Sequence, residues 1–210
     1  MIKILIADDH AVVREGFRKM VENDPELKIV AEAENGIEAL QMVRSKNIDV
    51  VILDMSMPEM SGLDCLKQIK SEFPDLPVLI FSMHPEEQYE QRVLQAGASG
   101  YLTKKTTPME VLQAIKDIAS GKKLMSEALK ERVIKGKGKL EEPHLKLSDR
   151  EFQVMKLIAK GWRSKEIANY LKISEKTVTT YRGRVLKKLG LDSNSDLVRY
   201  CIEHNIEIDA

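Results

Sequence analysis

Acidic, hydroxyl and basic side chains follow short apolar runs of the sequence. Asp8 and Asp9 come directly after IKILIA, Asp54 follows VVIL, and Ser82 follows PVLIF. Lys104 comes shortly after another such run, SGYL. Carboxylates that lie close together repel one another unless a hard cation lies among them, and Mg²⁺ prefers oxygen ligands of this kind. A hydroxyl and an ammonium group beside that cation would bind a phosphoryl group, because both can stabilise its oxygens.

The carboxylate of Asp54 would be the nucleophile of such a site and would form an aspartyl phosphate. Each residue also has an ordinary structural interpretation. These are a helix cap for Asp8 or Asp9, a turn for Asp54, a loop hydroxyl for Ser82 and a solvated surface charge for Lys104. Their occurrence together at the ends of successive apolar runs favours the phosphoryl site.

The alternation of apolar and amphipathic segments predicts how these side chains come together. Apolar runs predict buried strands at 2–7, 27–33, 50–53, 77–81 and 99–102, and helical spacing predicts helices at 11–22, 36–46, 62–73, 86–96 and 108–119. Strands that alternate with helices form a parallel, doubly wound sheet with helices on both faces. Ligands of such folds bind beyond the carboxyl ends of the strands, where the candidate site residues would lie.

The distribution of charge indicates two domains with different partners. Residues 1–120 contain 13 Lys and Arg against 20 Asp and Glu, whereas residues 145–210 contain 13 against 9. Residues 121–144 include the run KGKGK and predict a basic linker that begins with a short helix at 126–134. We therefore expect a five-stranded α/β domain at 1–120, a linker at 121–144 and a small all-α domain at 145–210.

Cysteine usage and hydropathy indicate a reducing compartment. Cys65 and Cys201 are the only cysteines, and the sequence has no CxxC motif. No apolar run reaches the roughly 18 residues that a membrane span needs. We therefore expect a cytoplasmic protein with no membrane partner.

The basic end of the chain has the pattern of a DNA-binding domain. Helical periodicity predicts helices near 149–159, 164–171, 175–189 and 194–204. Ser148 and Glu151 form a capping box at the start of the first helix, and Ser174 caps the third. The second and third helices are joined by a tight turn, which is the arrangement that reads DNA.

The helix at 175–189 has an apolar side and a side rich in basic and small polar residues. The apolar side comprises Val178, Tyr181, Val185 and Leu189. The candidate DNA contacts are Lys165 in the preceding helix and Lys176, Thr177, Thr179, Thr180, Arg182, Gly183, Arg184, Lys187 and Lys188 in this helix. Thr can contact base edges, and Arg and Lys can contact bases or phosphates. The alternative is a solvated cationic face, but the preceding helix and tight turn favour DNA.

Residues 1–120 resemble the receiver domain of two-component response regulators. The resemblance rests on the acidic pair, the segment LDMSMPEMSG, the serine at 82 and the segment AGASGYLTK. It implies that Asp54 is the phosphoacceptor. It also implies that Asp8, Asp9, Asp54 and the backbone carbonyl of Ser56 bind Mg²⁺.

The same resemblance assigns roles to the ends of the last two predicted strands. Ser82 would be the switch hydroxyl that follows the phosphoryl group, Tyr101 the aromatic residue that moves with it, and Lys104 the phosphoryl-pairing lysine. Tyr101 could also be an ordinary edge-strand aromatic. Many receivers have proline after the lysine, whereas this chain has Lys105.

Residues 145–205 resemble the LuxR/NarL-type helix-turn-helix output domain. The matching segments are LSDRE, SKEIA, ISEKTV and LKKLG, together with Gly161. Many members have Lys, Asn and His where this chain has Thr179, Thr180 and Tyr181, so we expect it to recognise a different DNA sequence. The last predicted helix often forms the dimer contact in this family, although it could also simply close the small core.

Together these patterns predict a phosphorylation-dependent transcription regulator rather than a conventional enzyme, with slow self-dephosphorylation. Its expected partners are a sensor histidine kinase, double-stranded DNA and a second copy of the chain when phosphorylated, and RNA polymerase is a further candidate. A haloacid-type phosphatase is an alternative, but it needs an acid two residues after the nucleophile, where this chain has Ser56. A phosphorylated module that binds another protein through its helical tail is a third interpretation, and salt-dependent duplex binding would distinguish it.

Overall fold

The computed structural model describes residues 1–83, 86–126, 143–204 and 206. The chain divides into two compact units, Met1–Gly138 and Lys139–Ala210. Apart from Ser126, the predicted linker helix at 126–134 lies outside the described residues. Among the helices that are described, none is both long enough and apolar enough to cross a membrane.

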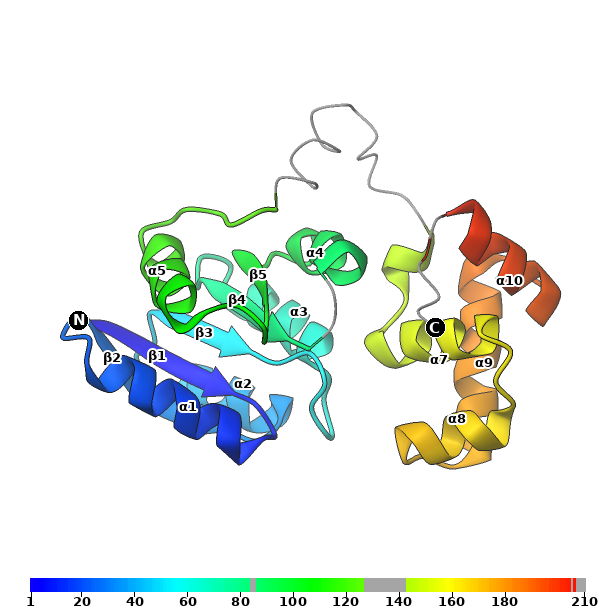
Figure 1. Cartoon of the computed structure of the whole chain (residues 1–210), viewed down its shortest axis with the longest axis horizontal. Coiled ribbons are helices and arrows are strands. Elements are labelled where there is room, and N and C mark those ends of the chain that lie inside the picture. The colour runs from blue at the N-terminus through cyan, green and yellow to red at the C-terminus, as the bar shows by residue number, and fades with distance from the viewer. Residues whose placement is uncertain (84–85, 127–142, 205, 207–210) are drawn as a thin grey trace. The chain divides into compact units, whose positions relative to one another are not determined.

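The first unit contains a five-stranded parallel sheet in the order β2-β1-β3-β4-β5 (Figure 1). Its strands are β1 (Ile2–Ala7), β2 (Leu27–Ala33), β3 (Val50–Leu53), β4 (Val78–Ser82) and β5 (Gly100–Thr103). The sheet confirms the parallel α/β fold that the sequence predicts. Strands β4 and β5 begin and end one residue later than predicted, because Ser82 pairs in register with Thr103 and both belong to the ladder.

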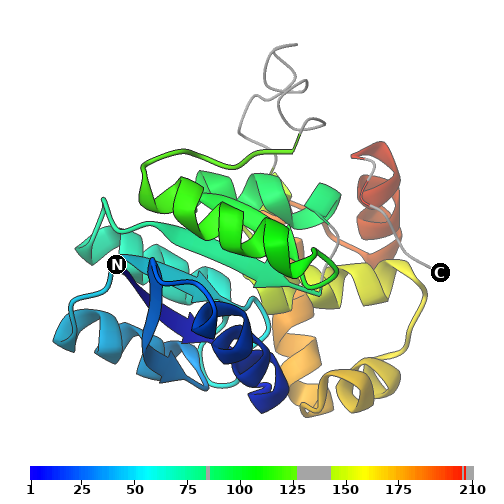
Figure 2. The same ribbon diagram turned by 60° about the vertical axis from the view of Figure 1, so that its left-hand side comes forward.

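Helices lie on both faces of the sheet (Figure 2). They are α1 (Ala11–Glu22), α2 (Gly36–Ser45), α3 (Gly62–Glu72), α4 (Glu86–Gln95) and α5 (Pro108–Ala119). Helices α1 and α5 share one core with the sheet, in which Phe17 packs on Phe81 and beside Ile4 and Ile6. Because side chains alternate along a strand, Leu5 points to the opposite face, where α2 and α3 pack together.

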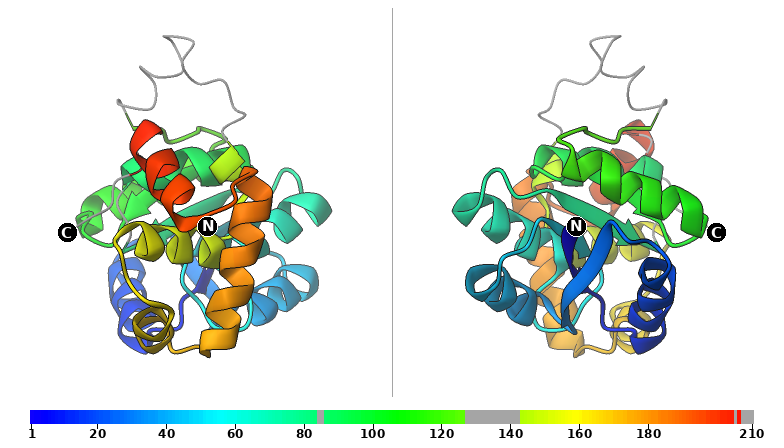
Figure 3. Two further views of the ribbon diagram at one scale, coloured as in Figure 1. Left: turned by 90° about the vertical axis from the view of Figure 1, so that its right-hand side faces the viewer. Right: turned by 90° about the vertical axis from the view of Figure 1, so that its left-hand side faces the viewer.

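The second unit is helical among its described residues. It contains a short 3₁₀ turn, η1 (Pro143–Lys146), followed by α7 (Asp149–Ala159), α8 (Ser164–Leu171), α9 (Glu175–Leu189) and α10 (Asn194–Glu203). Helix α7 packs against α9 and α10, and α8 packs against α9, as the left view of Figure 3 shows. The predicted capping box of Ser148 and Glu151 and the cap at Ser174 are both present, and Gly161 ends α7 with a φ of +84°.

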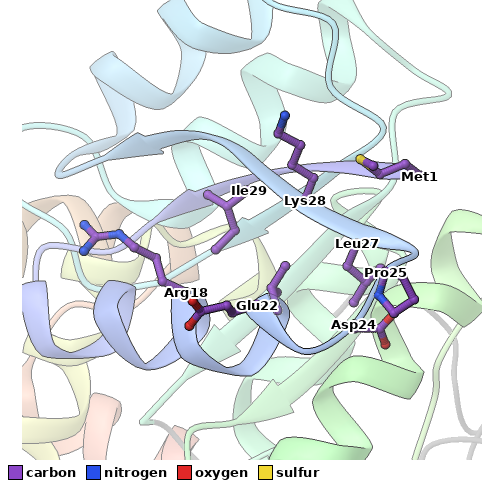
Figure 4. A pocket seen from close by; sticks show the side chains of 9 residues that line it. Met1, Arg18, Glu22, Asp24, Pro25, Leu27, Lys28 and Ile29 are labelled. Carbon is purple, nitrogen blue, oxygen red and sulfur yellow. The ribbon is translucent and has the colours of Figure 1, made fainter.

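A pocket of about 350 Å³ lies in the first unit between α1 and β2 (Figure 4). Its lining is formed by Met1, Arg18, Val21, Glu22, Asp24, Pro25, Leu27, Lys28 and Ile29. These residues gather where β1 and β2 begin, whereas the candidate phosphoryl site lies where the strands end. None of the residues that the sequence assigns to a function lines this pocket.

Candidate functional site

The carboxyl ends of β1, β3 and β5 bring three charged side chains into contact. Nζ of Lys104 lies 2.6 Å from Oδ2 of Asp8 and 3.3 Å from Oδ2 of Asp54. The two carboxylates are 3% exposed and the lysine side chain is 8% exposed. The alignment follows from the sheet, because β1 pairs with β3 and the amide of Asp54 donates to the carbonyl of Ala7 at 2.9 Å. The structure therefore places the predicted nucleophile, an acid and a lysine at one point.

Burial sets the electrostatics of this point. It raises the pKa of Asp54 from 3.8 to about 6, although Lys104 acts in the opposite direction, and the charge of Asp8 adds to the rise. A buried carboxylate that resists ionisation to this extent is stabilised by any further positive charge beside it. A divalent cation would supply that charge.

Ligand atoms of Asp8, Asp9, His10 and Asp54 lie within 4.8 Å of one another. Three of the four ligands are carboxylates, which suit a hard cation such as Mg²⁺. The carboxylate of Asp9 is partly exposed and would leave room for retained waters. The donor set therefore fits the metal that the sequence predicts.

His10 is a member of this cluster that the sequence reasoning missed. Its Nδ1 lies 3.1 Å from Oδ1 of Asp8 and 2.8 Å from Oδ1 of Asp9, and its amide donates to Oδ1 of Asp8. The imidazole is largely exposed. Its position directly after Asp8 and Asp9 is the feature of the sequence that could have indicated a metal ligand.

Arg14 is a second residue that the sequence reasoning missed. Its Nη1 donates to the carbonyl oxygen of Asp8 at 2.7 Å, and its guanidinium pairs with Glu32 and Glu34. The side chain is buried on the same face of α1 as Phe17. The feature of the sequence that could have indicated this residue is a basic side chain at an inward-facing position of a predicted helix. The contact of Arg14 with the carbonyl of Asp8 holds the end of β1 in place.

The loop after Asp54 depends on Gly62. A Cβ atom at Gly62 would lie 2.0 Å from the carbonyl oxygen of Asp54 and 2.8 Å from Cα of Met55. The amide of Gly62 donates to the carbonyl of Met55 at 3.0 Å. Helix α3 therefore begins in direct contact with the backbone of Asp54, the predicted phosphoacceptor. Ser56, whose carbonyl is the predicted metal ligand, lies exposed in the turn that this contact closes.

Ser82 and Tyr101 are both buried on neighbouring strands. Ser82 ends β4, and its carbonyl accepts a hydrogen bond of 2.7 Å from the amide of Lys104. Tyr101 lies on β5 in register with Ile80. The pairing of β4 with β5 thus places the predicted switch hydroxyl and the predicted phosphoryl-pairing lysine at the same edge, while the switching roles stay predictions.

The segment that follows α5 is hydrogen-bonded to other parts of the first unit. The amide of Leu124 donates to the carbonyl of Ser99 at 2.8 Å. The amide and hydroxyl of Ser126 donate to the two carboxylate oxygens of Glu90 at 2.6 and 2.5 Å. Glu90 is a buried residue of α4. The last described residues before the second unit are therefore tied to the helix that follows Ser82.

The basic side of α9 is exposed as the sequence predicts. The exposed candidate contacts are Lys165 on α8 and Lys176, Thr179, Thr180, Gly183, Arg184, Lys187 and Lys188 on α9. The inward face differs from the prediction at two positions, because Tyr181 is only half buried and Leu186 is buried together with Val178, Val185 and Leu189. Tyr181 lies at the edge of the stripe that these residues form along a helix of 3.6 residues per turn.

Three of the candidate contacts are held by their own domain. Nζ of Lys188 lies 2.6 Å from Oε2 of Glu151, a buried carboxylate. Although burial alone would raise the pKa of Glu151, the ammonium of Lys188 holds that pKa below its usual value. Nε of Arg182 donates to Oδ1 of Asn194 at 2.6 Å, and the hydroxyl of Thr177 lies 2.8 Å from that of the helix cap. Other basic residues of α9 form no ion pair with a described residue; they are Lys176, Arg184 and Lys187.

Comparison with known protein families gives two matches along the chain. Residues 4–116 match the response regulator receiver domain, and residues 145–201 match the luxR family of bacterial regulatory proteins. The response regulator UvrY of Escherichia coli K12 is 36% identical over 209 residues, covering 98% of this chain and 96% of UvrY. The oxygen regulatory protein NreC of Staphylococcus epidermidis is 37% identical over 215 residues, covering 98% of this chain and 99% of NreC.

Solved structures resemble the chain over nearly its whole length. RcsB from Salmonella enterica serovar Typhimurium, bound to promoter rprA in the presence of the phosphomimetic BeF3-, matches with a TM-score of 0.62 and 28% identity. That match covers 95% of this chain and 97% of RcsB. A structure of two RcsB dimers bound to two parallel DNAs matches with a TM-score of 0.57 and 27% identity, covering 96% of this chain and 98% of that chain.

Proposed function

Because the chain belongs to the response regulators that join a receiver domain to a luxR-family DNA-binding domain, we propose that a phosphoryl group on Asp54 controls its binding to duplex DNA. The observation that carries the proposal is the contact of Lys104 with both Asp8 and Asp54 at the carboxyl edge of the sheet. The proposal also divides the chain into a receiver domain at 1–120, a linker at 121–144 and a DNA-binding domain at 145–210.

The proposed chemistry is transfer of a phosphoryl group from the phosphohistidine of a sensor kinase to Oδ of Asp54. The carboxylate of Asp54 attacks phosphorus, and the histidine nitrogen leaves. The ammonium of Lys104 then pairs with a phosphoryl oxygen, and the hydroxyl of Ser82 donates to another. Asp8, Asp9, Asp54 and the carbonyl of Ser56 would hold Mg²⁺, which, when bound, offsets the charge on the phosphoryl oxygens.

The proposed activity is that of a regulator, with only slow loss of the phosphoryl group by hydrolysis. The phosphatase alternative needs a general acid two residues after the nucleophile. Ser56 occupies that position, and its hydroxyl is a poor proton donor compared with a carboxylic acid. The buried carboxylate and lysine therefore support formation of an acyl phosphate more than its rapid turnover.

Transmission from the phosphoryl site is proposed to run through Ser82 and α4. Ser82 ends β4, α4 follows a few residues later, and Glu90 on α4 holds the segment after α5 through Ser126. A hydroxyl that follows the phosphoryl group would shift the start of this path. Tyr101, buried on the adjacent strand, is the proposed partner of that movement.

The DNA partner is proposed to contact α9, and a second copy of the chain is proposed to contact α10 after phosphorylation. Ile202 on α10 is 67% exposed and Val198 is half buried, so part of this helix stays apolar and accessible. Two α9 helices in a dimer would read half-sites about one helical turn apart. The sensor kinase and the DNA are reached in the cytoplasm, which is the proposed location, and RNA polymerase is a further proposed partner.

Labelling with a small phosphodonor tests the phosphoryl site. With Mg²⁺ and acetyl phosphate, we expect the wild-type chain to gain one base-labile phosphoryl group in an intact-mass measurement. Asp54→Asn should gain none, because the nucleophile is lost. Asp75→Asn is the matched control, since Asp75 is exposed and belongs to no described site. Equal labelling of the wild type and Asp54→Asn would overturn the assignment.

A further inference from the structure

Thr179 and Thr180 lie next to each other on the exposed side of α9, and their hydroxyl protons are already used. Oγ1 of Thr179 donates to the carbonyl of Glu175 at 3.0 Å, and Oγ1 of Thr180 donates to the carbonyl of Lys176 at 2.9 Å. Both bonds run back along the helix by one turn. Each side chain therefore presents to the outside a methyl group and an oxygen that can only accept.

The space around these threonines allows a close approach. Gly183 lies on the same side of α9 as both threonines, four residues after Thr179 and three residues after Thr180. A Cβ atom at Gly183 would have no neighbour within 4 Å. Lys176 and Lys187 are exposed on the same helix and form no ion pair with a described residue. Sequence-independent attraction to phosphates can therefore come from the lysines, and base selection can come from the threonines.

The base pairs differ in what they offer to such a surface in the major groove. A guanine edge offers only acceptors, and cytosine offers an amino donor but no methyl group. In a T·A pair, thymine offers the C5 methyl group and adenine offers an N6 amino donor. To donate to guanine, each threonine would have to give up its hydrogen bond to the backbone carbonyl. A T·A pair can contact both the methyl group and the hydroxyl oxygen while that bond stays in place.

We propose that Thr179 and Thr180 make α9 select T·A base pairs at the positions that they face, by packing on thymine methyl groups and accepting from adenine amino groups. The proposal rests on the proposed function, in that α9 must enter the major groove. It goes beyond that function because it specifies the chemistry of the preferred site.

Replacing thymine with deoxyuracil tests the methyl contact without changing the protein. Duplexes are first selected from a random pool with the phosphorylated full-length protein, and each thymine of the selected site is then replaced in turn. We expect a T·A pair in each half-site at which the replacement weakens binding about fourfold, which is the contribution of one buried methyl group. Thymines elsewhere in the same duplex are the matched controls.

Two variants separate the methyl group from the hydroxyl group. In Thr180→Ser the methyl group is lost, so thymine and deoxyuracil duplexes should bind equally at the position that this residue faces. In Thr180→Val the methyl group stays, so the preference for thymine over deoxyuracil should stay as well. Thr179→Ser and Thr179→Val should behave in the same way at the neighbouring position.

The outcomes distinguish this inference from the function on which it rests. Sequence-specific binding that responds to deoxyuracil at no position, or selected half-sites with only G·C pairs where α9 contacts them, would overturn the inference and leave DNA binding intact. A protein that selects no duplex at any salt concentration would overturn the proposed function and this inference with it.

Discussion

Lys104 at the edge of the receiver sheet and Lys187 on α9 have opposite surroundings. Lys104 is buried in contact with Asp8 and Asp54. Lys187 is exposed, and it forms no ion pair with any residue that the structure describes. The first lysine is positioned before any ligand arrives, whereas the second is hydrated and can bind DNA phosphates, which releases cations condensed on the DNA.

Lys188 shows why the difference matters. It neighbours Lys187 in the sequence, yet its ammonium is bound to the buried carboxylate of Glu151. A basic residue on the helix that is proposed to bind DNA can therefore serve the core of its own domain. Its surroundings, more than its charge, indicate whether it is available to a ligand.

The largest effect on stability is expected at Gly62, where the receiver has no space for a side chain. Gly62→Ala should destabilise the chain by about 3 kcal/mol or more, because its Cβ atom would lie 2.0 Å from the carbonyl oxygen of Asp54. Gly16→Ala is the control, since a Cβ atom there has no neighbour within 4 Å and alanine favours the helix. Urea denaturation of both variants checks this, and equal stability would contradict the tight contact.

The next largest effect concerns the buried charge. The rise of the Asp54 pKa from 3.8 to about 6 corresponds to about 3 kcal/mol against the ionised form. The folded chain binds this proton more tightly than the unfolded chain, so this contribution to stability falls as the pH rises from 4 through 6. Without Mg²⁺, Asp54→Asn should therefore be more stable than the wild type at pH 7, and the gap should shrink toward pH 4.

Urea denaturation in EDTA at several pH values measures this gap. Asp75→Asn, at an exposed position, should show no comparable gap. An advantage of Asp54→Asn that is absent at pH 7, or the same at every pH, would contradict a raised pKa of Asp54 in the folded chain.

The adjacent lysines of α9 provide a third comparison. Lys187→Ala should weaken binding to all duplexes and reduce the slope of log K against log salt by about one, without changing stability. Lys188→Ala should instead lower the stability of the second unit by about 1–3 kcal/mol, because the carboxylate of Glu151 loses its cation. Fluorescence anisotropy over a salt series and thermal denaturation separate the two effects. Equal losses of affinity and of stability in the two variants would contradict the different roles of Lys187 and Lys188.

The smallest effect is expected at the glycine on α9. Gly183→Ala should stabilise the helix by about 0.5–1 kcal/mol, since nothing lies within 4 Å of its Cβ position. The same change should weaken binding to the selected duplex, because the added methyl group would occupy the space that the bases approach. Gly16→Ala should stabilise the chain without this loss of affinity. A Gly183→Ala variant that binds DNA as well as the wild type would show that the helix does not approach the bases there.

Periodicity predicted the elements because burial in this fold follows the sequence closely. The strand before Asp54 is apolar throughout and the strand before Asp8 is apolar except for Lys3, since helices cover both faces of a parallel sheet. The convergence of Asp8, Asp54 and Lys104 could also be predicted, because the carboxyl ends of parallel strands share one edge.

Contacts between side chains far apart in the sequence could not be predicted in this way. The pairing of Lys188 with Glu151 spans 37 residues, and the pairing of Ser126 with Glu90 spans 36. Each depends on how two helices or a helix and a loop pack, which the spacing of residues within one segment does not reveal. The hydroxyl bonds of Thr179 and Thr180 are local, but they are a choice of rotamer that the residue type alone leaves open.

Binding of one selected duplex before and after phosphorylation tests most directly whether the two regions are linked. Full-length protein is titrated into labelled duplex with Mg²⁺, with and without acetyl phosphate, for the wild type and Asp54→Asn. Acetyl phosphate should raise the affinity of the wild type and leave Asp54→Asn unchanged. A wild type whose affinity does not respond to acetyl phosphate, or an equal response from Asp54→Asn, would contradict control of DNA binding by a phosphoryl group on Asp54.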